Sequence, residues 1–206
     1  MKKSKLYSFI VAIIRPFVRV LYGLKVYGIE NIPKNGGCII CPNHTSNADP
    51  VLLAITFPRQ IYFMAKEELF KNKILGKLFK MVGAFPVERG KRDASAINTA
   101  EKVLNKGEQL GLFIEGTRSK TGDFLRPKTG CTMIAYKTKV PILPVCINGA
   151  NEFKVKVLKK NVIIIGTPIY PENLNLSEGS GKEFREGSRL IMQNIKDLAP
   201  SFYTQK

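Results

Sequence analysis

The sequence predicts an α/β fold with a mixed, largely parallel sheet flanked by helices. Short apolar runs with strand character alternate along the chain with longer segments of helical period, and this alternation is typical of strands joined by crossover helices. The 206 residues are enough for one sizeable core. We therefore expect an α/β domain over residues 25–206, preceded by a helical segment over residues 1–24.

Residues 1–24 predict an amphipathic helix that lies in a membrane surface. A helical wheel places Lys5, Ser8, Arg15 and Arg19 on one face and apolar residues elsewhere, which is the pattern of an interfacial anchor. The apolar run is shorter than the roughly 20 residues that cross a bilayer, and no small-residue cleavage site follows it. Pro16 is expected to kink or divide the helix. A helix packed on the protein's own core has a similar pattern.

The remaining elements follow in order along the chain. We expect strands over residues 25–34, 38–41, 60–65, 81–90 (a short one), 110–114, 140–147 and 162–166, and helices from Asp49 onward and over residues 67–80, 93–106, 131–138 and 184–197. The first of these strands reads as an edge strand. Pro141 and Pro144 also suggest an edge strand or a bulge, here as the wall of an apolar channel.

The composition limits the possible partners and the redox environment. The net charge of +17 favours a polyanionic partner, which can be nucleic acid, an anionic membrane or a phosphorylated substrate. Cys38 and Cys41 form a C-x-x-C motif, but residues three apart in a strand point to opposite faces and cannot share a metal ion. Four cysteines without a secretory signal fit a reducing cytosol.

The only histidine of the chain, His44, lies three residues after the apolar strand 38–41 and is followed five residues later by Asp49. Open α/β sheets place their sites at the carboxyl ends of strands. A neutral imidazole is suited to removing a proton near pH 7, and a carboxylate on its other nitrogen fixes the tautomer. Since no nucleophile motif accompanies the pair, a substrate hydroxyl is expected to be the nucleophile. In the alternative interpretation, His44 is an ordinary loop residue and Asp49 is favoured by the helix dipole.

Three further positions indicate an anion-binding site at the same edge. Lys66 follows the strand 60–65, and Arg89 follows a short strand, where a guanidinium can bind a phosphate through two hydrogen bonds. The segment 115–118, Glu-Gly-Thr-Arg, can surround an oxyanion with backbone donors. Its spacing is not that of a Walker loop.

Taken together, these residues resemble the glycerolipid acyltransferase family, specifically the 1-acylglycerol-3-phosphate acyltransferases. Four motifs of that family occur in order: N-H-x-x-x-x-D-P at residues 43–50, G-x-F-x-x-x-R at residues 83–89 with Gly83, Phe85 and Arg89, F-x-E-G-T-R-S at residues 113–119, and an apolar strand with Pro141 and Pro144. The family's third motif usually has a proline where this chain has Ile114. The resemblance covers roughly residues 25–170.

The resemblance implies a reaction and roles for these residues. His44 would deprotonate the sn-2 hydroxyl of lysophosphatidic acid, Asp49 would orient His44, and the acyl group would come from acyl-coenzyme A or acyl carrier protein without a covalent acyl-enzyme, a metal or a cofactor. The substrate phosphate would be bound by Lys66, Arg89, Glu115, Gly116, Thr117 and Arg118. Phe85, Pro141 and Pro144 would shape the acyl channel. The enzyme would act in phospholipid biosynthesis at the cytoplasmic face of the cell membrane, attached to an anionic surface.

Three other functions compete with this interpretation. An enzyme of the same family could acylate a different lysophospholipid or another lipid. A nucleic-acid-binding protein would fit the charge, but the aromatic residues lie mostly in apolar runs rather than among lysines and arginines. A catalytically silent membrane scaffold would not need the His44–Asp49 pair.

Overall fold

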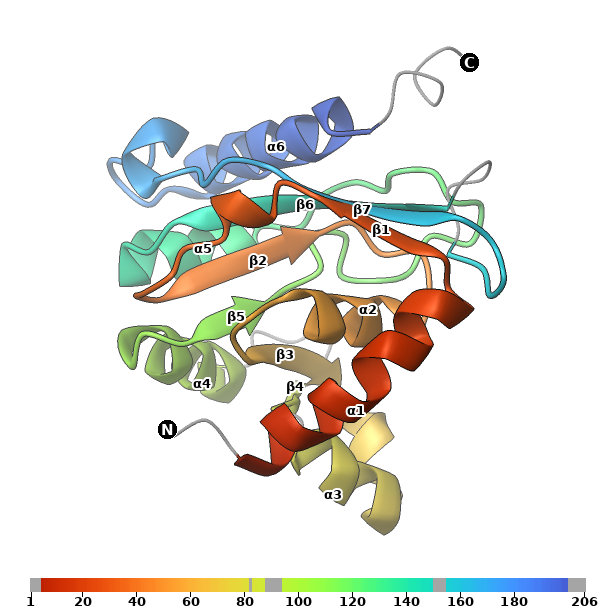
Figure 1. The fold of residues 1–206 in the computed structure, drawn as a ribbon. Helices are drawn as coiled ribbons and strands as arrows, with labels where there is room; N and C mark the ends of the chain where they lie inside the picture. Colours follow the sequence, from red (N-terminus) through yellow and green to blue (C-terminus); the bar gives the residue numbers. More distant parts are fainter. Residues whose placement is uncertain (1–4, 82, 88–93, 150–154, 200–206) are drawn as a thin grey trace.

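The computed structural model describes residues 5–81, 83–87, 94–149 and 155–199, and its fold is the predicted mixed, largely parallel α/β arrangement (Figure 1). The described strands form one seven-stranded sheet in the order β1-β7-β6-β2-β5-β3-β4. Neighbouring strands pair in parallel, except that β6 and β7 are antiparallel. The strands are β1 (Leu24–Tyr27), β2 (Cys38–Pro42), β3 (Ile61–Lys66), β4 (Phe85–Val87), β5 (Gln109–Gly111), β6 (Ile142–Gly149) and β7 (Asn161–Ile165).

The helices lie on both faces of the sheet. They are α1 (Lys5–Leu21), α2 (Asp49–Thr56), α3 (Lys73–Met81), α4 (Ala94–Asn105), α5 (Gly130–Thr138) and α6 (Gly181–Asp197), with 3₁₀ turns at Ile29–Asn31, Glu67–Phe70 and Pro171–Leu174. Helices α1 and α2 cover one face, and α4, α5 and α6 cover the other (Figure 1). The sheet is therefore the middle layer of three, and both of its faces are buried, as parallel sheets require.

Strand β2 lies in the interior of the sheet and shows how the two cores are divided. Ile39 and Cys41 belong to the apolar cluster that contains α4, α5 and α6, whereas Cys38 and Ile40 belong to the cluster that contains α1 and α2. The two cysteines thus point to opposite faces, as the period of a strand predicts. All four cysteines are buried and free.

Strand β6 is the clearest departure from expectation, because it lies between β7 and β2 in the interior of the sheet. The expectation of an edge strand is therefore wrong. The alternative of a bulge agrees with the pairing on one side, because the register shifts by one residue between Val145–Ile165 and the isolated bridge Ile142–Ile169. Pro141 precedes the strand. The carbonyl of Pro144 accepts the N–H of Gly166 at 2.9 Å, one residue beyond the end of β7. The N–H that Pro144 lacks would face this same position, which lies beyond β7 and beside the shift in pairing to Ile142–Ile169, so the proline is tolerated.

The predicted helix over residues 67–80 is divided into a 3₁₀ turn at Glu67–Phe70 and α3 from Lys73 onward. Helix α3 folds back on that turn, and Gly76 is the point of closest approach. A Cβ atom at Gly76 would lie 2.7 Å from the carbonyl oxygen of Phe70, so a larger residue would clash with backbone there. In place of one long helix, the chain forms a short 3₁₀ turn and the nine-residue helix α3, which packs against it.

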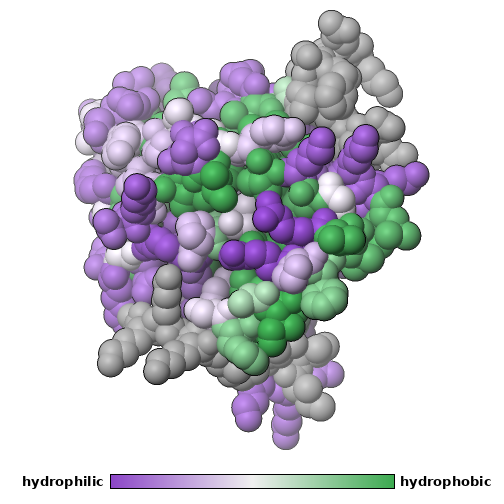
Figure 2. All heavy atoms as spheres, viewed as in Figure 1, coloured by the Kyte–Doolittle hydropathy of each residue, from purple (hydrophilic) through white to green (hydrophobic). Residues whose placement is uncertain are grey.

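Helix α1 is continuous through Pro16 and has apolar residues on two faces. On the inner face, Tyr7 and Val11 are buried in the cluster shared with α2, and the Tyr7 hydroxyl lies 3.4 Å from the carbonyl oxygen of Ala54. On the outer face, large apolar side chains are exposed to solvent (Figure 2). They are Phe9, Ile13, Phe17, Val20 and Leu21. No helix in the described part of the chain is long and apolar enough to cross a membrane.

Helix α6 begins with a reciprocal cap. The Ser180 hydroxyl accepts the backbone N–H of Glu183 at 3.3 Å, and the Glu183 carboxylate accepts the backbone N–H of Ser180 at 3.0 Å. This capping box satisfies two donors that the first turn would otherwise leave without a partner. Further along, Ile191, Met192 and Ile195 are buried in the core. The cap therefore fixes the start of a helix that closes one face of the sheet.

We predict that Ser180→Ala lowers the free energy of unfolding by about 1 kcal/mol, because the first turn of α6 loses its side-chain acceptor. Ser180→Asn, which keeps a side-chain oxygen at this position, should remain close to the wild type. Urea unfolding of the three proteins measures the difference. A Ser180→Ala protein as stable as the wild type would show that the cap contributes nothing.

Candidate active site

The candidate site begins where the main chain leaves β2. Pro42, the last residue of β2, pairs with Val145 of β6. Beyond it, the side-chain amide of Asn43 continues the pairing, because its Oδ1 accepts the N–H of Ile147 at 2.7 Å and its Nδ2 donates to the carbonyl of Ile147 at 3.0 Å. The buried side chain thus takes the place of a backbone segment, and the main chain is free to turn away from the sheet. This role of Asn43 was not expected from its place in the first motif.

His44 and Asp49 are in contact, as the sequence predicts. The Nδ1 atom of His44 lies 2.8 Å from Oδ2 of Asp49, and the carboxylate is fully buried. The same oxygen accepts the backbone N–H of Thr45 at 2.7 Å and that of Ser46 at 2.8 Å. Asp49 is the first residue of α2, where a negative charge is stabilised by the helix dipole. The helix dipole and the contact with His44 therefore both favour a charged carboxylate at Asp49, although the sequence interpretation treated them as alternatives.

This geometry decides which ring nitrogen of His44 is available. An ionised carboxylate only accepts hydrogen bonds, so the hydrogen of a neutral imidazole must lie on Nδ1. The lone pair is then on Nε2, which is the atom that can remove a proton. The side chain is 10% exposed and therefore mostly shielded from water.

The segment after β5 fixes the ring from the other side. The ring of Phe113 stacks on that of His44, with centroids 3.8 Å apart and an interplanar angle of 20°. The backbone N–H of Ser119 donates to the carbonyl of His44 at 2.8 Å. The first and third motifs are therefore one physical unit, in which Phe113 limits the rotation of the imidazole. The sequence placed Phe113 in the third motif but gave no indication of the stacking.

Glu115 points toward the interior and not toward solvent. Its Oε1 atom accepts the backbone N–H of His44 at 3.2 Å, and the residue is buried. Burial raises the pKa of Glu115 from its ordinary 4.5 to about 7, although the backbone N–H groups of His44 and Leu125 oppose the shift. In this position the carboxyl group supports the loop that carries His44, and a direct contact of Glu115 with a substrate phosphate stays a prediction. The residue type alone could not show this orientation.

The three residues that follow Glu115 are exposed at the same edge of the sheet. Gly116 has φ +69°, a backbone conformation that favours glycine, and its N–H donates to the carbonyl of Phe113 at 3.0 Å. This turn presents Thr117 and Arg118 to solvent. They lie between Glu115 and Ser119, which both contact His44 through its backbone, and anion binding by them stays a prediction.

The other predicted site residues are distributed as follows. Lys66 ends β3 at the carboxyl edge and pairs with Val87, the last residue of β4; the structure describes its backbone but not its side chain. Arg89, two residues after Val87 in the sequence, lies outside the described residues. Phe85, in β4, is partly buried against the core, and Pro144 is buried in β6. The strand ends therefore gather at one edge. In the described part of the chain, no group of three or more histidine, cysteine or acidic side chains could hold a metal ion.

Comparisons with known proteins agree with this geometry. A family model described as Acyltransferase matches residues 23–148, which contain β1 to β6 apart from its last residue. A 1-acyl-sn-glycerol-3-phosphate acyltransferase of Bacillus subtilis (strain 168) is 36% identical over 195 residues, covering 94% of this chain and 96% of that protein. A protein of the same name from Borreliella burgdorferi is 36% identical over 66% of this chain, and the match covers 56% of that protein. Another from Streptococcus pneumoniae is 36% identical over 76% of this chain, and the match covers 60% of that protein.

A solved structure is also similar along most of the chain. It is the crystal structure of the 1-acyl-sn-glycerophosphate (LPA) acyltransferase, PlsC, from Thermotoga maritima, which is 28% identical and has a TM-score of 0.71. The alignment covers 96% of this chain and 83% of that one. Because a family model and a relative of nearly equal length both match the region that builds the site, the chain belongs to the acyltransferase family.

Proposed function

We propose that the enzyme transfers a fatty acyl group from an acyl thioester to the sn-2 hydroxyl of 1-acyl-sn-glycerol-3-phosphate, giving phosphatidic acid in phospholipid biosynthesis. The observation that carries this proposal is the buried contact of 2.8 Å between His44 and Asp49. The relatives described above are named for this reaction. The anion-binding turn after Glu115 lies at the same edge of the sheet and fits an acceptor with a phosphate group.

In the proposed mechanism, Nε2 of His44 removes the proton of the sn-2 hydroxyl. The oxygen attacks the thioester carbonyl carbon, a tetrahedral intermediate forms, and the carbon–sulfur bond breaks. The imidazolium, stabilised by Asp49, returns its proton to the departing sulfur, which leaves as a thiol. Since the thioester already supplies an activated acyl group and the substrate supplies the nucleophile, this scheme needs neither a cofactor nor a covalent acyl-enzyme.

Phosphate binding in the proposal depends on Gly116, Thr117 and Arg118, together with Lys66 and Arg89 as the family resemblance implies. Arg118 is exposed, and no acidic partner for it is found among the described residues. A guanidinium in this state can form two charge-assisted hydrogen bonds with a phosphate. Glu115 has a different part in the proposal: it positions His44 through the backbone.

The acyl donor is proposed to be anionic, as acyl-coenzyme A and acyl carrier protein both are. A small cleft lined by Arg126, Pro127, Arg185 and Arg189 supports this. Its segment lies near the site, because the backbone N–H of Lys128 donates to the carbonyl of Ile114, the residue before Glu115, at 2.8 Å. The net charge of +17 also favours anionic partners.

Attachment to the cytoplasmic face of the membrane is proposed through the outer face of α1. Phe17 is 71% exposed and Val20 is 81% exposed, and a folded protein gains nothing from leaving such side chains in water. A helix whose inner face packs on the core and whose outer face is apolar fits a protein that lies on the bilayer without crossing it.

We predict that His44→Ala reduces phosphatidic acid formation at least about 100-fold, because the general base is lost. Purified protein in detergent would receive lysophosphatidic acid with acyl-coenzyme A and with acyl carrier protein thioester in separate assays, which also identifies the donor. Asn47→Ala, an exposed change in the same loop, is the control and should be fully active. Wild-type activity in His44→Ala would exclude the mechanism.

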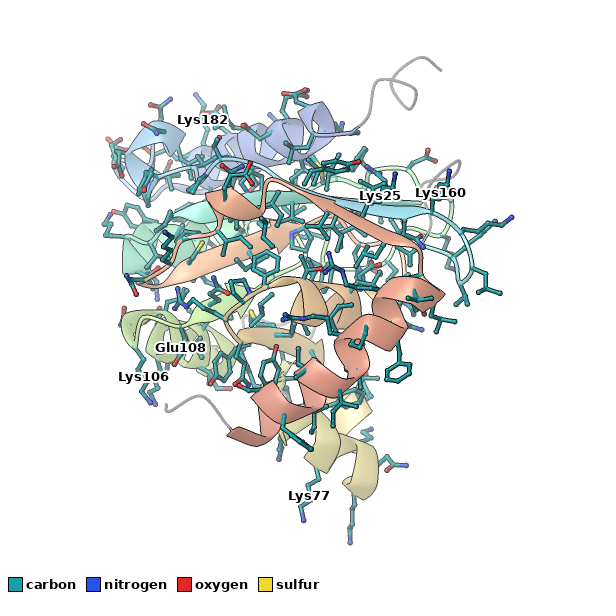
Figure 3. The ribbon with its side chains drawn as sticks, viewed as in Figure 1. Lys25, Lys77, Lys106, Glu108, Lys160 and Lys182 are labelled. Carbon is teal, nitrogen blue, oxygen red and sulfur yellow. The ribbon has the colours of Figure 1, made fainter. Side chains whose placement is uncertain are left out.

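We predict that Arg118→Ala raises the KM for lysophosphatidic acid about tenfold or more, since a charged hydrogen-bond donor is removed. The rate with monoacylglycerol, which has no phosphate, should not change. Lys106→Ala removes a charge beyond the other end of α4, away from the site, and is the matched control (Figure 3). If the wild type acylates another lysolipid better than lysophosphatidic acid, the alternative acceptor within the family is favoured.

We predict that Glu115 makes stability fall as the pH rises. Because its pKa is raised to about 7 in the folded protein, the folded state holds the proton more tightly than the unfolded state between pH 4.5 and about 7. The free energy of unfolding should therefore decrease across this interval, and it should decrease less in Glu115→Gln. Urea unfolding at pH 5 and pH 8 tests this, with the exposed Glu172→Gln as control. An unchanged pH dependence in Glu115→Gln would contradict the assignment.

A further inference from the structure

The connection that leads into β7 holds two apolar side chains in solvent beside the end of α1. Leu158 is 79% exposed and Val157 is 48% exposed. Leu158 has φ +59°, a left-handed backbone conformation that is uncommon for any residue except glycine, asparagine and aspartate. A tight turn in water would normally use one of those residues. The sequence instead places a large apolar side chain at the tip.

Hydrogen bonds hold this tip rigidly against α1. The backbone N–H of Leu158 donates to the carbonyl of Leu21, the last residue of α1, at 2.8 Å. The side chain of Asn161 is fully buried and donates to the carbonyls of Tyr22, Lys156 and Lys159, while its oxygen accepts the N–H of Lys156 at 3.0 Å. The exposure of Leu158 is therefore built into the fold.

The tip and the outer face of α1 form one apolar surface with a basic border. Val20 and Leu21 are exposed directly beside the tip, and Figure 2 shows apolar residues on this side of the molecule. Lys159 and Lys160 are exposed next to Leu158, and Lys25 and Lys160 lie at this same end in Figure 3. Apolar side chains bordered by lysines complement a bilayer that contains anionic lipids.

The tip also lies at the edge of the sheet that carries the site. Strands β2 and β6 are parallel, so their carboxyl ends share one edge. His44 follows β2 at this edge, and β7 starts there at Asn161, which pairs with Gly149 at the end of β6. A bilayer in contact with the tip would therefore face the edge from which a lipid acceptor must enter.

We propose that Val157 and Leu158 form a second membrane contact, which inserts into an anionic bilayer beside the end of α1 and orients the site toward the lipid. This inference rests on the proposed attachment of the enzyme to a membrane. It adds a contact outside the N-terminal helix, and it assigns a purpose to an exposed leucine in a strained conformation.

The absence of tryptophan in the chain allows a direct test. Leu158→Trp should show a blue shift of its emission on addition of vesicles of phosphatidylcholine with phosphatidylglycerol, and brominated lipids should quench it. Leu190→Trp, at an exposed leucine on α6 across the sheet from α1, should show neither effect. If the Leu158→Trp protein sediments with the vesicles but its tryptophan emission neither shifts nor is quenched, the second contact is excluded and the proposed membrane attachment is not affected.

A loss-of-contact variant completes the test. Leu158→Asn removes the apolar side chain and suits the left-handed conformation, so its melting temperature should not fall. Its binding to the same vesicles should be about tenfold weaker than that of the wild type, whereas Leu190→Asn should bind normally. Activity on short-chain lysophosphatidic acid in solution should be unchanged. Equal binding of Leu158→Asn and wild type would overturn the inference, and a wild type that does not bind vesicles would overturn the proposed membrane attachment with it.

Discussion

The site depends on one buried carboxylate oxygen. Oδ2 of Asp49 accepts hydrogen bonds from Nδ1 of His44 and from the backbone N–H groups of Thr45 and Ser46. One atom thereby fixes the tautomer of the base, the path of the loop and the start of α2. Because the carboxylate is fully buried, removal of its partners would leave a charge without compensation, which costs several kcal/mol.

The sheet gathers the rest of the site around this oxygen. Asn43 replaces a backbone segment in the ladder to β6, and the chain after β5 supplies Phe113, Glu115 and Ser119, each of which contacts His44. The motifs are distant in sequence but adjacent in the sheet, since β2 lies between β5 and β6. Parallel order brings their carboxyl ends to one edge, and the segment at Leu158 that leads into β7 lies at this same edge.

The sequence predicted the alternating elements and the His44–Asp49 contact because both are local: the period of each segment sets its type, and five residues separate base and carboxylate. It failed where long-range packing decides. The prolines of β6 suggested an edge, yet Pro144 is tolerated because β7 ends beside it. Glu115 was assigned to phosphate binding by its motif alone, which did not indicate that its carboxyl group is buried against His44. The helix over residues 67–80 was predicted as one piece, and the contact of Gly76 with Phe70 divides it.

The central claim is that Asp49 holds His44 with its hydrogen on Nδ1 and its lone pair on Nε2. His44 is the only histidine of the chain, so nitrogen-15 NMR of histidine-labelled protein gives the signals of this single ring. At a pH where the ring is neutral, we predict a protonated Nδ1 and an unprotonated Nε2 in the wild type, and loss of this preference in Asp49→Ala. A hydrogen on Nε2 in the wild type would contradict the account, because that nitrogen could not act as the base.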